Sequence, residues 1–402
     1  MIYWKYDIIL LLVTLCTRIA NATDNSTRAL NKILLDYDKK IRPDQEGPPT
    51  TVTIGVYVES LGSIRETTMD FSVTMFLRQT WTDPRLAHGG NEEVIFKGDD
   101  TEKFWYPDIF FLYEKNSVKH DVTIRNVGMR VRSDGEVFRS ARLTVTLACN
   151  MDLYEFPMDS QNCDIFMMSY AYPTSELILT IPQTEVFVEP NITIPRFTLK
   201  GVKTRNTELV YSTGNFSCAQ ATLSLERQMQ SYVLTVYVPN LLLVIIAWLS
   251  FWIDAEAAPA RVALGVTTIL TVTTMTTNIQ ETLPVVTYTK AIDVWQVACL
   301  IFVFLSLLEY SFANYLLVLQ VKSQRTSYSI RKLDEDSQQT RKAPALSKIE
   351  RNEDGNVTTY RPALAQKEPR LSSHQLDKLA RIVYPGAFVL FNVFYWAYYL
   401  IN

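Results

Sequence analysis

The residues best suited to a chemical task lie in the threonine-rich segment 259–281. Its sequence, PARVALGVTTILTVTTMTTNIQE, is apolar enough to cross a bilayer. As a helix it is roughly 33 Å long at about 1.5 Å per residue, which matches the hydrocarbon core. Steps of four and three residues place one set of side chains on a single face: Ala263, Thr267, Leu270, Thr274 and Thr277. Only Leu270 is large and apolar, so this stripe is poorly suited to lipid.

Threonine also has simpler roles in membrane helices, because its hydroxyl can bond to a carbonyl one turn earlier or hold a neighbouring helix. These roles explain any single threonine of the segment. They do not explain hydroxyls that recur on one face, with Arg261 near one end. We therefore expect a helix whose hydroxylated stripe lines water, as in a pore.

Enzymatic and nucleic-acid-binding functions find no support in the sequence. It contains no nucleophile elbow, metal-ligand cluster or phosphate-binding loop, so we expect no catalytic residues and no cofactor. After residue 20 the only histidines are His88, His120 and His374, which is weak support for a metal site. The net charge of −3 gives no global sign of nucleic-acid binding.

The composition and hydrophobic pattern change along the chain, and these changes predict the elements that position this segment. Residues 1–20 combine a lysine, a short apolar run and a small final residue, as in a cleavable signal peptide. Residues 21–228 contain alternating stretches such as TVTIGVYV and RLTVTLAC between turn-rich segments, which predict an extracellular β-sandwich. Residues 229–319 contain three apolar spans, of which 259–281 is the second.

A fourth span at 379–402 completes the predicted topology and returns the C-terminus to the extracellular side. Residues 320–378 then form a cytoplasmic loop, in which Lys and Arg outnumber Asp and Glu. Their polar composition predicts a flexible connector, with a helix from about Ser372 that continues into the fourth span. The predicted fold class is a multidomain membrane protein, an extracellular all-β sandwich followed by a four-helix transmembrane bundle.

Cysteines and glycosylation sequons agree with export of the first domain. Cys149, Cys163 and Cys218 remain outside the membrane spans, so they can form one disulfide and leave one unpaired thiol. Sequons predict glycans at four asparagines: Asn21, Asn25, Asn191 and Asn215.

The segment between Cys149 and Cys163 carries an apolar tip, Phe156-Pro157-Met158-Asp159. Closure of a loop of this size stabilises a fold by about 3 kcal/mol, which a purely structural role would explain. An exposed apolar tip favours a second role, docking against an apolar surface such as the membrane domain.

With these features the chain resembles the Cys-loop family of pentameric ligand-gated ion channels over nearly its whole mature length. The matching motifs, in order, are Trp81-Thr-Asp-Pro-Arg85, Trp105-Tyr-Pro-Asp108, the loop from Cys149 to Cys163, Arg227 before the first span, Pro239 within it, and Pro259-Ala-Arg261. The resemblance implies a Cys149–Cys163 disulfide and assembly with four further identical or homologous subunits. It also implies a plasma-membrane, postsynaptic location with both termini extracellular.

The resemblance further implies a route from agonist binding to pore opening. Force would pass through the tip of the Cys149–Cys163 loop to the linker after the pore helix. The residues that match this route are Phe156, Pro157, Asp159, Arg227, Leu283 and Pro284.

Within the family, three motifs are similar to those of anion-conducting glycine, GABA type A and invertebrate glutamate-gated receptors. They are Pro259-Ala260-Arg261, the TTILT of residues 267–271, and Lys290-Ala-Ile-Asp293. Cation-conducting relatives carry a glutamate ring where Ala260 stands, so we expect chloride as the permeant ion, with Arg261 at the inner mouth. Gln280 and Glu281 replace a basic residue that such receptors often carry at the outer end.

The resemblance also implies an agonist site between neighbouring extracellular domains. Its aromatic and hydroxyl half is matched by Phe111, Tyr170, Tyr172, Tyr211, Thr213 and Phe216, and its arginine half by Phe76, Arg78, Ser140 and Arg142. Three residues depart from relatives. Met168 replaces a glutamate of glycine and GABA sites, Thr207 replaces a cysteine that would pair with Cys218, and Glu59 replaces a second arginine of glutamate-gated channels.

These departures leave the class of agonist open between an amino acid, an amine, protons or hydroxide, and a metal ion. The leading hypothesis is a chloride channel opened by such an agonist. The alternative is an accessory subunit that assembles with others and has no competent agonist site of its own.

Overall fold

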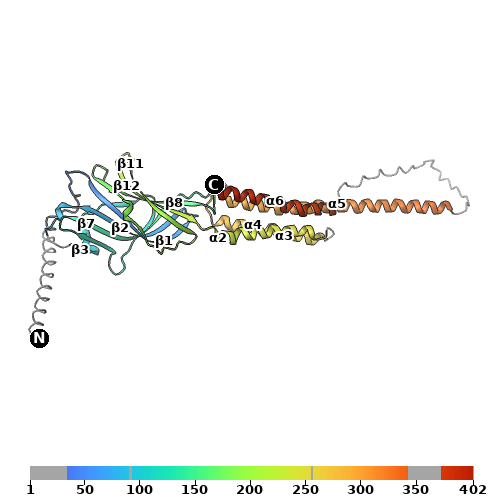
Figure 1. The fold of residues 1–402 in the computed structure, drawn as a ribbon, viewed down its shortest axis with the longest axis horizontal. Helices are drawn as coiled ribbons and strands as arrows, with labels where there is room; N and C mark the ends of the chain where they lie inside the picture. The colour runs from blue at the N-terminus through green and yellow to red at the C-terminus, as the bar shows by residue number, and fades with distance from the viewer. Residues whose placement is uncertain (1–33, 90–92, 255–256, 343–372, 402) are drawn as a thin grey trace, which may run out of the picture. The chain divides into compact units, whose positions relative to one another are not determined.

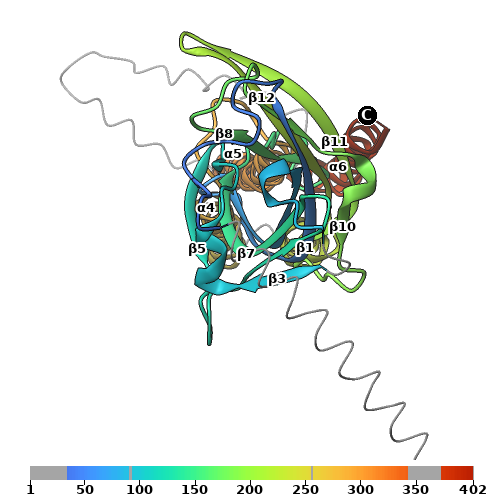
Figure 2. The ribbon, with the colours of Figure 1, turned by 90° about the vertical axis from the view of Figure 1, so that its left-hand side faces the viewer.

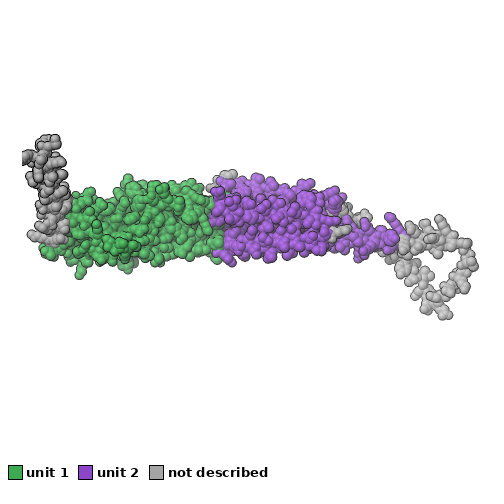
Figure 3. All heavy atoms as spheres, turned by 90° about the horizontal axis from the view of Figure 1, so that it is seen from below, with its two compact units in different colours: residues 1–229, 282–287 green, residues 230–281, 288–402 purple. Residues whose placement is uncertain are grey.

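The computed structural model describes residues 34–89, 93–254, 257–342 and 373–401. The chain divides into two compact units, coloured separately in Figure 3: residues 1–229 with 282–287, and residues 230–281 with 288–402. The predicted signal peptide, the sequons at Asn21 and Asn25, and residues 343–372 of the predicted cytoplasmic loop lie outside the described residues.

The first unit is a β-sandwich of two sheets (Figure 1). The larger sheet has the order β10-β1-β2-β7-β6-β3, with β5 paired to β7 and β9 paired to β1, and the smaller has the order β11-β12-β8-β4. The strands are β1 Thr50–Arg65, β2 Asp70–Thr82, β3 Val94–Lys97, β4 Ile109–Phe111, β5 Glu114–Lys119, β6 Val127–Val131, β7 Glu136–Ala148, β8 Ser160–Ser169, β9 Leu177–Thr180, β10 Val186–Val188, β11 Phe197–Tyr211 and β12 Gly214–Arg227.

Buried and more exposed residues alternate along the strands, which explains why the two sheets pack as a sandwich. In β2 every second residue from Phe71 to Leu77 is buried, and in β12 every second residue from Ala219 to Leu225 is buried. Because neighbouring side chains of a strand point to opposite faces, each sheet has one apolar face for the core. Figure 2 shows β1, β5 and β7 on one side of the sandwich and β8, β11 and β12 on the other. The predicted β-sandwich is confirmed.

The second unit contains four helical segments that are long and apolar enough to cross a membrane: Gln230–Trp252, Ala258–Glu281, Ala291–Ser329 and His374–Leu400. The first combines α2 Gln230–Tyr232, the π-helical turn η4 Val233–Tyr237, α3 Val238–Trp248 and the 3-10 turn η5 Leu249–Trp252. The others belong to α4 Ala258–Glu281, α5 Ala291–Lys342 and α6 Ser373–Ile401. Four spans after the sandwich are thereby confirmed.

One expectation about the loop was wrong. The third span was expected to end at Leu319 and to lead into a flexible connector, but α5 remains helical to Lys342. The physical reason is local, because residues 320–342 contain neither proline nor glycine and are rich in Gln, Lys and Arg, which favour helix. The start of α6 at Ser373 agrees with the helix expected from about Ser372.

Candidate functional site

An outer face of the larger sheet gathers the residues predicted for the arginine half of a binding site. In the register of β2 and β7, Phe76 lies opposite Arg142, and Arg78 lies opposite Ser140. Strand β1 adds Tyr57, which lies opposite Phe76 and meets its ring edge-on at a centroid distance of 6.0 Å. The guanidinium of Arg78 lies 5.5 Å from the centre of the Tyr57 ring. All five side chains are half-buried, so they form a shallow surface that a small molecule can reach.

The two arginines of this face differ in their partners. Arg142 donates two hydrogen bonds to the carboxylate of Glu59, from Nε at 2.7 Å and from Nη2 at 3.1 Å. These bonds raise the pKa of Arg142 and occupy its guanidinium. Arg78 makes no hydrogen bond and no ion pair with any residue in the part of the chain that the structure describes. Arg78 is therefore the cation of this face that can receive an anionic group.

The aromatic half lies on the smaller sheet and on the loops that leave it. Tyr170, at the end of β8, is 79% exposed and contacts Phe110 at a centroid distance of 5.8 Å. Tyr211 and Phe216 flank the β11–β12 turn with their rings 5.9 Å apart. Tyr172 packs on Trp105, and its hydroxyl accepts a hydrogen bond from the indole Nε1 at 3.4 Å. Thr213 is exposed in the same turn.

Two predicted residues of this half, Phe111 and Phe216, are buried, and Phe216 is 8% exposed. Phe111 is only 7% exposed, because β4 alternates and turns Phe111 into the sandwich while Phe110 faces Tyr170. In the sequence, the adjacent residues Phe110 and Phe111 are equally suited to an aromatic site. Only the pairing of β4 with β8 decides which one faces outward.

Asp108 holds the Tyr170 loop, a role that the sequence analysis did not assign. Its carboxylate accepts hydrogen bonds from Ser169 Oγ at 2.6 Å and from the Ala171 backbone N–H at 2.7 Å. The Thr174 N–H donates to the Asn215 carbonyl at 2.8 Å, which ties the same loop to the β11–β12 turn. The motif Trp105-Tyr-Pro-Asp108 was the available signal, since a buried or half-buried aspartate needs donors.

The two halves come from different sheets of the sandwich. The arginine half lies on β1, β2 and β7, whereas the aromatic half lies on β4, β8, β11 and β12. The predicted departure at Thr207 is also visible, because Thr207 lies directly opposite Cys218 in the β11–β12 register. Cys218 is buried and unpaired, and burial raises the pKa of its thiol.

Helix α4 presents the predicted stripe away from the other helices of its unit. The stripe residues Ala263, Thr267, Leu270, Thr274 and Thr277 are all exposed, and Leu270 is 63% exposed. The threonine hydroxyls also bond to carbonyls one turn earlier, for example Thr267 to Ala263 at 2.7 Å. Pro259 and Ala260 are exposed at the start of the helix.

Arg261 does not share this exposure, contrary to the expectation that it would border the inner mouth. It is 1% exposed and pairs with Asp377 of α6 at 2.9 and 3.1 Å. Its Nε also donates to the Ile253 carbonyl at 3.0 Å. The next turn of α4 explains the burial, because Arg261 lies on the same face as the buried residues Gly265 and Thr268. Arg261 therefore anchors α4 to α6.

The disulfide Cys149–Cys163 is present, and its loop is packed rather than exposed at the tip. Phe156 is 1% exposed, and the guanidinium of Arg227 lies 4.6 Å from the centre of its ring. The expectation of an exposed apolar tip was wrong at Phe156, because the ring covers a buried arginine. Residues 282–287 belong to the same compact unit as the sandwich, with Leu283 buried and Pro284 half-buried.

The predicted glycosylation sites that the structure describes are accessible. Asn191 lies in an exposed turn, and Asn215 is exposed on β12 beside the Tyr211 turn.

A sandwich with a short disulfide loop, followed by four membrane-spanning helices, defines a multi-pass ligand-gated ion channel subunit. Comparison with known families agrees. The neurotransmitter-gated ion-channel ligand binding domain matches residues 26–229, and the neurotransmitter-gated ion-channel transmembrane region matches residues 236–368. The chain belongs to this family, the Cys-loop ligand-gated ion channels, whose members are channels and not enzymes. Its sandwich is the ligand-binding domain of this family, which implies a small extracellular agonist.

Proposed function

We propose that the chain is a subunit of a pentameric chloride channel that opens when a small agonist binds between extracellular domains, with α4 lining the pore. The observation that carries the proposal is the stripe of α4, which is small, hydroxylated and exposed along its whole length. Around a five-fold axis, five such stripes enclose a polar path with Leu270 as its one apolar ring.

Chloride selectivity is supported by the N-terminal end of α4. The exposed residues there are Pro259 and Ala260, and the only acidic residue in α4 is Glu281 at its other end. A helix N-terminus carries a positive partial charge, so five of them favour an anion at this mouth. Because Arg261 is paired with Asp377, the helix ends and not the Arg261 side chain are the main source of this field.

An agonist site between subunits is supported by the separation of its two halves. Arg78 offers an unpaired guanidinium for a carboxylate, and the exposed rings of Tyr170 and Tyr211 offer ring faces for an ammonium group. An amino acid carries both groups, so it is the class of agonist that the two halves support best. Expressing the chain alone and screening amino acids, amines, pH and metal ions tests this class. If the chain reaches the cell surface but gives no current when expressed alone, and a co-expressed relative restores the current, the accessory-subunit alternative is favoured.

Arg78→Lys should weaken a carboxylate agonist by about ten- to a hundredfold. The reason is that lysine cannot reproduce two parallel hydrogen bonds to a carboxylate, and bonds to charged groups are worth about 1.5–3 kcal/mol. The measurement is a concentration–response curve, with Arg130→Lys on the exposed surface of β6 as the matched control. A curve for Arg78→Lys that overlays the wild type would reject a carboxylate agonist.

Leu270→Ser should open the channel without agonist or raise its agonist sensitivity by about tenfold, equivalent to ~1.4 kcal/mol of lost closed-state stability. An apolar ring closes a narrow pore by excluding water, and serine removes that barrier. The control is Leu264→Ser, because Leu264 lies about 120° from Leu270 around the same helix. Equal effects of both variants, or a Leu270→Ser channel that is expressed and shows neither change, would argue against α4 as the pore-lining helix.

A further inference from the structure

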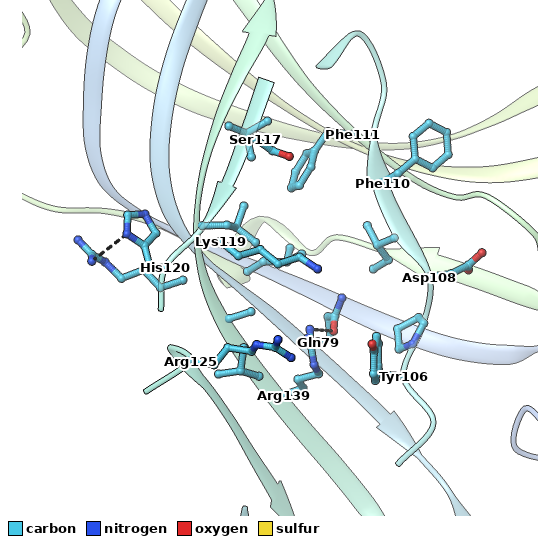
Figure 4. Close-up of a pocket in the computed structure, with 18 of the residues that line it drawn as sticks. Gln79, Tyr106, Asp108, Phe110, Phe111, Ser117, Lys119, His120, Arg125 and Arg139 are labelled. Carbon is cyan, nitrogen blue, oxygen red and sulfur yellow. Dashed lines mark hydrogen bonds between the residues drawn. The ribbon is translucent and has the colours of Figure 1, made fainter. Parts of the chain in front are cut away.

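The sandwich encloses a cavity of about 240 Å³ whose lining residues alternate along the strands with the arginine half of the agonist site (Figure 4). On β2, Gln79 of the cavity follows Arg78 of the outer face, and on β7, Arg139 precedes Ser140. The same two strands therefore carry the outer face and the wall of the cavity.

Arg139 is the unusual residue of this cavity. Its Nη1 donates to Gln79 Oε1 at 3.0 Å, and its guanidinium lies 4.5 Å from the centre of the Tyr106 ring. Its Nε is buried and has no hydrogen-bond partner among the described residues, and no carboxylate of those residues pairs with Arg139. Burial lowers the pKa of Arg139, but a guanidinium remains charged. The half-buried guanidinium of Arg139 therefore has a buried donor without an acceptor, which an anionic ligand would stabilise.

A second cation faces the same space. Lys119, at the end of β5, makes no ion pair with any residue that the structure describes, and Figure 4 shows its amino group extending toward the middle of the cavity. The other lining arginines are neutralised, since Arg125 pairs with Glu102 and Arg142 pairs with Glu59.

The remaining lining acids do not offset these two cations. The carboxylate of Asp108 is held by Ser169 and the Ala171 N–H, and in Figure 4 it points away from Arg139. Glu114 lies opposite Leu147 of β7, eight residues from Arg139, which is about 26 Å along a strand. Among the described residues, no carboxylate that lines the cavity forms an ion pair with Arg139 or Lys119.

The other walls are apolar. Phe111, Leu77 and Val145 line the cavity and are buried. Ser117 and Lys119 are exposed at its rim, which gives a small molecule access from solvent. Phe111, predicted for the agonist site, therefore contributes to this second space instead.

We propose that this cavity is a binding site for a small monocarboxylate with an apolar or aromatic body. The carboxylate accepts hydrogen bonds from Arg139 and an ion pair from Lys119, and the body packs on Phe111 and Leu77. Arg139, Gln79 and Leu77 lie on the inner side of β2 and β7, so the cavity is distinct from the agonist face around Arg78, although Arg142 borders both.

The test measures binding of 4-fluorobenzoate to the purified, assembled full-length chain in lipid nanodiscs by fluorine NMR. We expect saturable binding that is at least about tenfold tighter than that of the neutral analogue 4-fluorobenzamide. The reason is that only the carboxylate accepts charge-assisted hydrogen bonds between two charged groups from the Arg139 guanidinium. Arg139→Gln should weaken 4-fluorobenzoate by about ten- to a hundredfold. Arg205→Gln, the same charge change on the exposed β11, should bind as the wild type does.

Two further variants keep the test decisive. Lys119→Gln alters an exposed side chain, so it should fold even where Arg139→Gln does not, and it should weaken 4-fluorobenzoate by about three- to tenfold. Equal binding of the acid and the amide, or unchanged binding in both Arg139→Gln and Lys119→Gln, would overturn the site. Loss of binding in Arg78→Lys but in neither cavity variant would place the ligand on the outer face and would also overturn it.

Discussion

Arg227→Gln should leave the receptor unable to reach the cell surface in a folded form. The Arg227 side chain is fully buried and pairs with two carboxylates, Asp159 of the disulfide loop at 2.7 and 3.1 Å and Glu66 of the β1–β2 turn. The rings of Phe156 and Phe197 lie 4.6 and 4.4 Å from its guanidinium. Removing this one cation leaves two buried carboxylates without their partner.

Breaking a buried ion pair in this way costs about 3–5 kcal/mol, which is a large part of the roughly 5–15 kcal/mol that stabilises a typical domain. The measurements are surface biotinylation in cells and the Tm of the purified receptor. Arg65→Gln is the matched control, because Arg65 is 52% exposed and its partner Asp70 retains Lys115. Surface levels and a Tm for Arg227→Gln equal to those of Arg65→Gln would show that the buried pairs do not hold the disulfide loop in place.

The buried cluster of Arg227, Asp159 and Glu66 offers a physical route for the proposed coupling between agonist binding and gating. Asp159 belongs to the disulfide loop, Glu66 to the β1–β2 turn and Arg227 to the end of β12, so one guanidinium joins three segments of the sandwich. A movement of any one segment changes the contacts of the other two. We propose that this cluster transmits the agonist signal.

Much of the fold could be predicted because its signals are local. Strand alternation in β2 and β12 marks the faces of the sandwich, and four apolar segments of sufficient length mark the spans. The length of α5 was missed because a polar helix carries no apolar period. The available signals were the absence of proline and glycine and the abundance of helix-favouring Gln, Lys and Arg in residues 320–342.

The candidate site shows where such reasoning ends. The common face of Phe76 and Arg78 could be predicted, because the two residues are two positions apart on one strand. The pairing of Arg142 with Glu59 joins residues 83 positions apart, and the choice between Phe110 and Phe111 depends on how β4 pairs with β8. Arg261 was misplaced for a similar reason, since its partner Asp377 lies 116 positions away on α6. Long-range partners of charged groups are not encoded in spacing.

The second large effect expected is complete anion selectivity of the open channel. The first turn of α4, with Pro259 and Ala260, contains no carboxylate, and the stripe along the helix is uncharged. A cation that enters meets five positive helix ends without an acidic residue in the first helical turn, whereas chloride is attracted there. Glu281 at the other end reduces conductance without reversing this preference.

The most direct measurement is the reversal potential of the current, recorded either on agonist application or from the spontaneous current of Leu270→Ser. External chloride is replaced by gluconate in one series, and external sodium by a large organic cation in another. A reversal potential that follows the chloride gradient and ignores sodium agrees with a chloride channel lined by α4. A reversal potential that follows sodium and ignores chloride would contradict it.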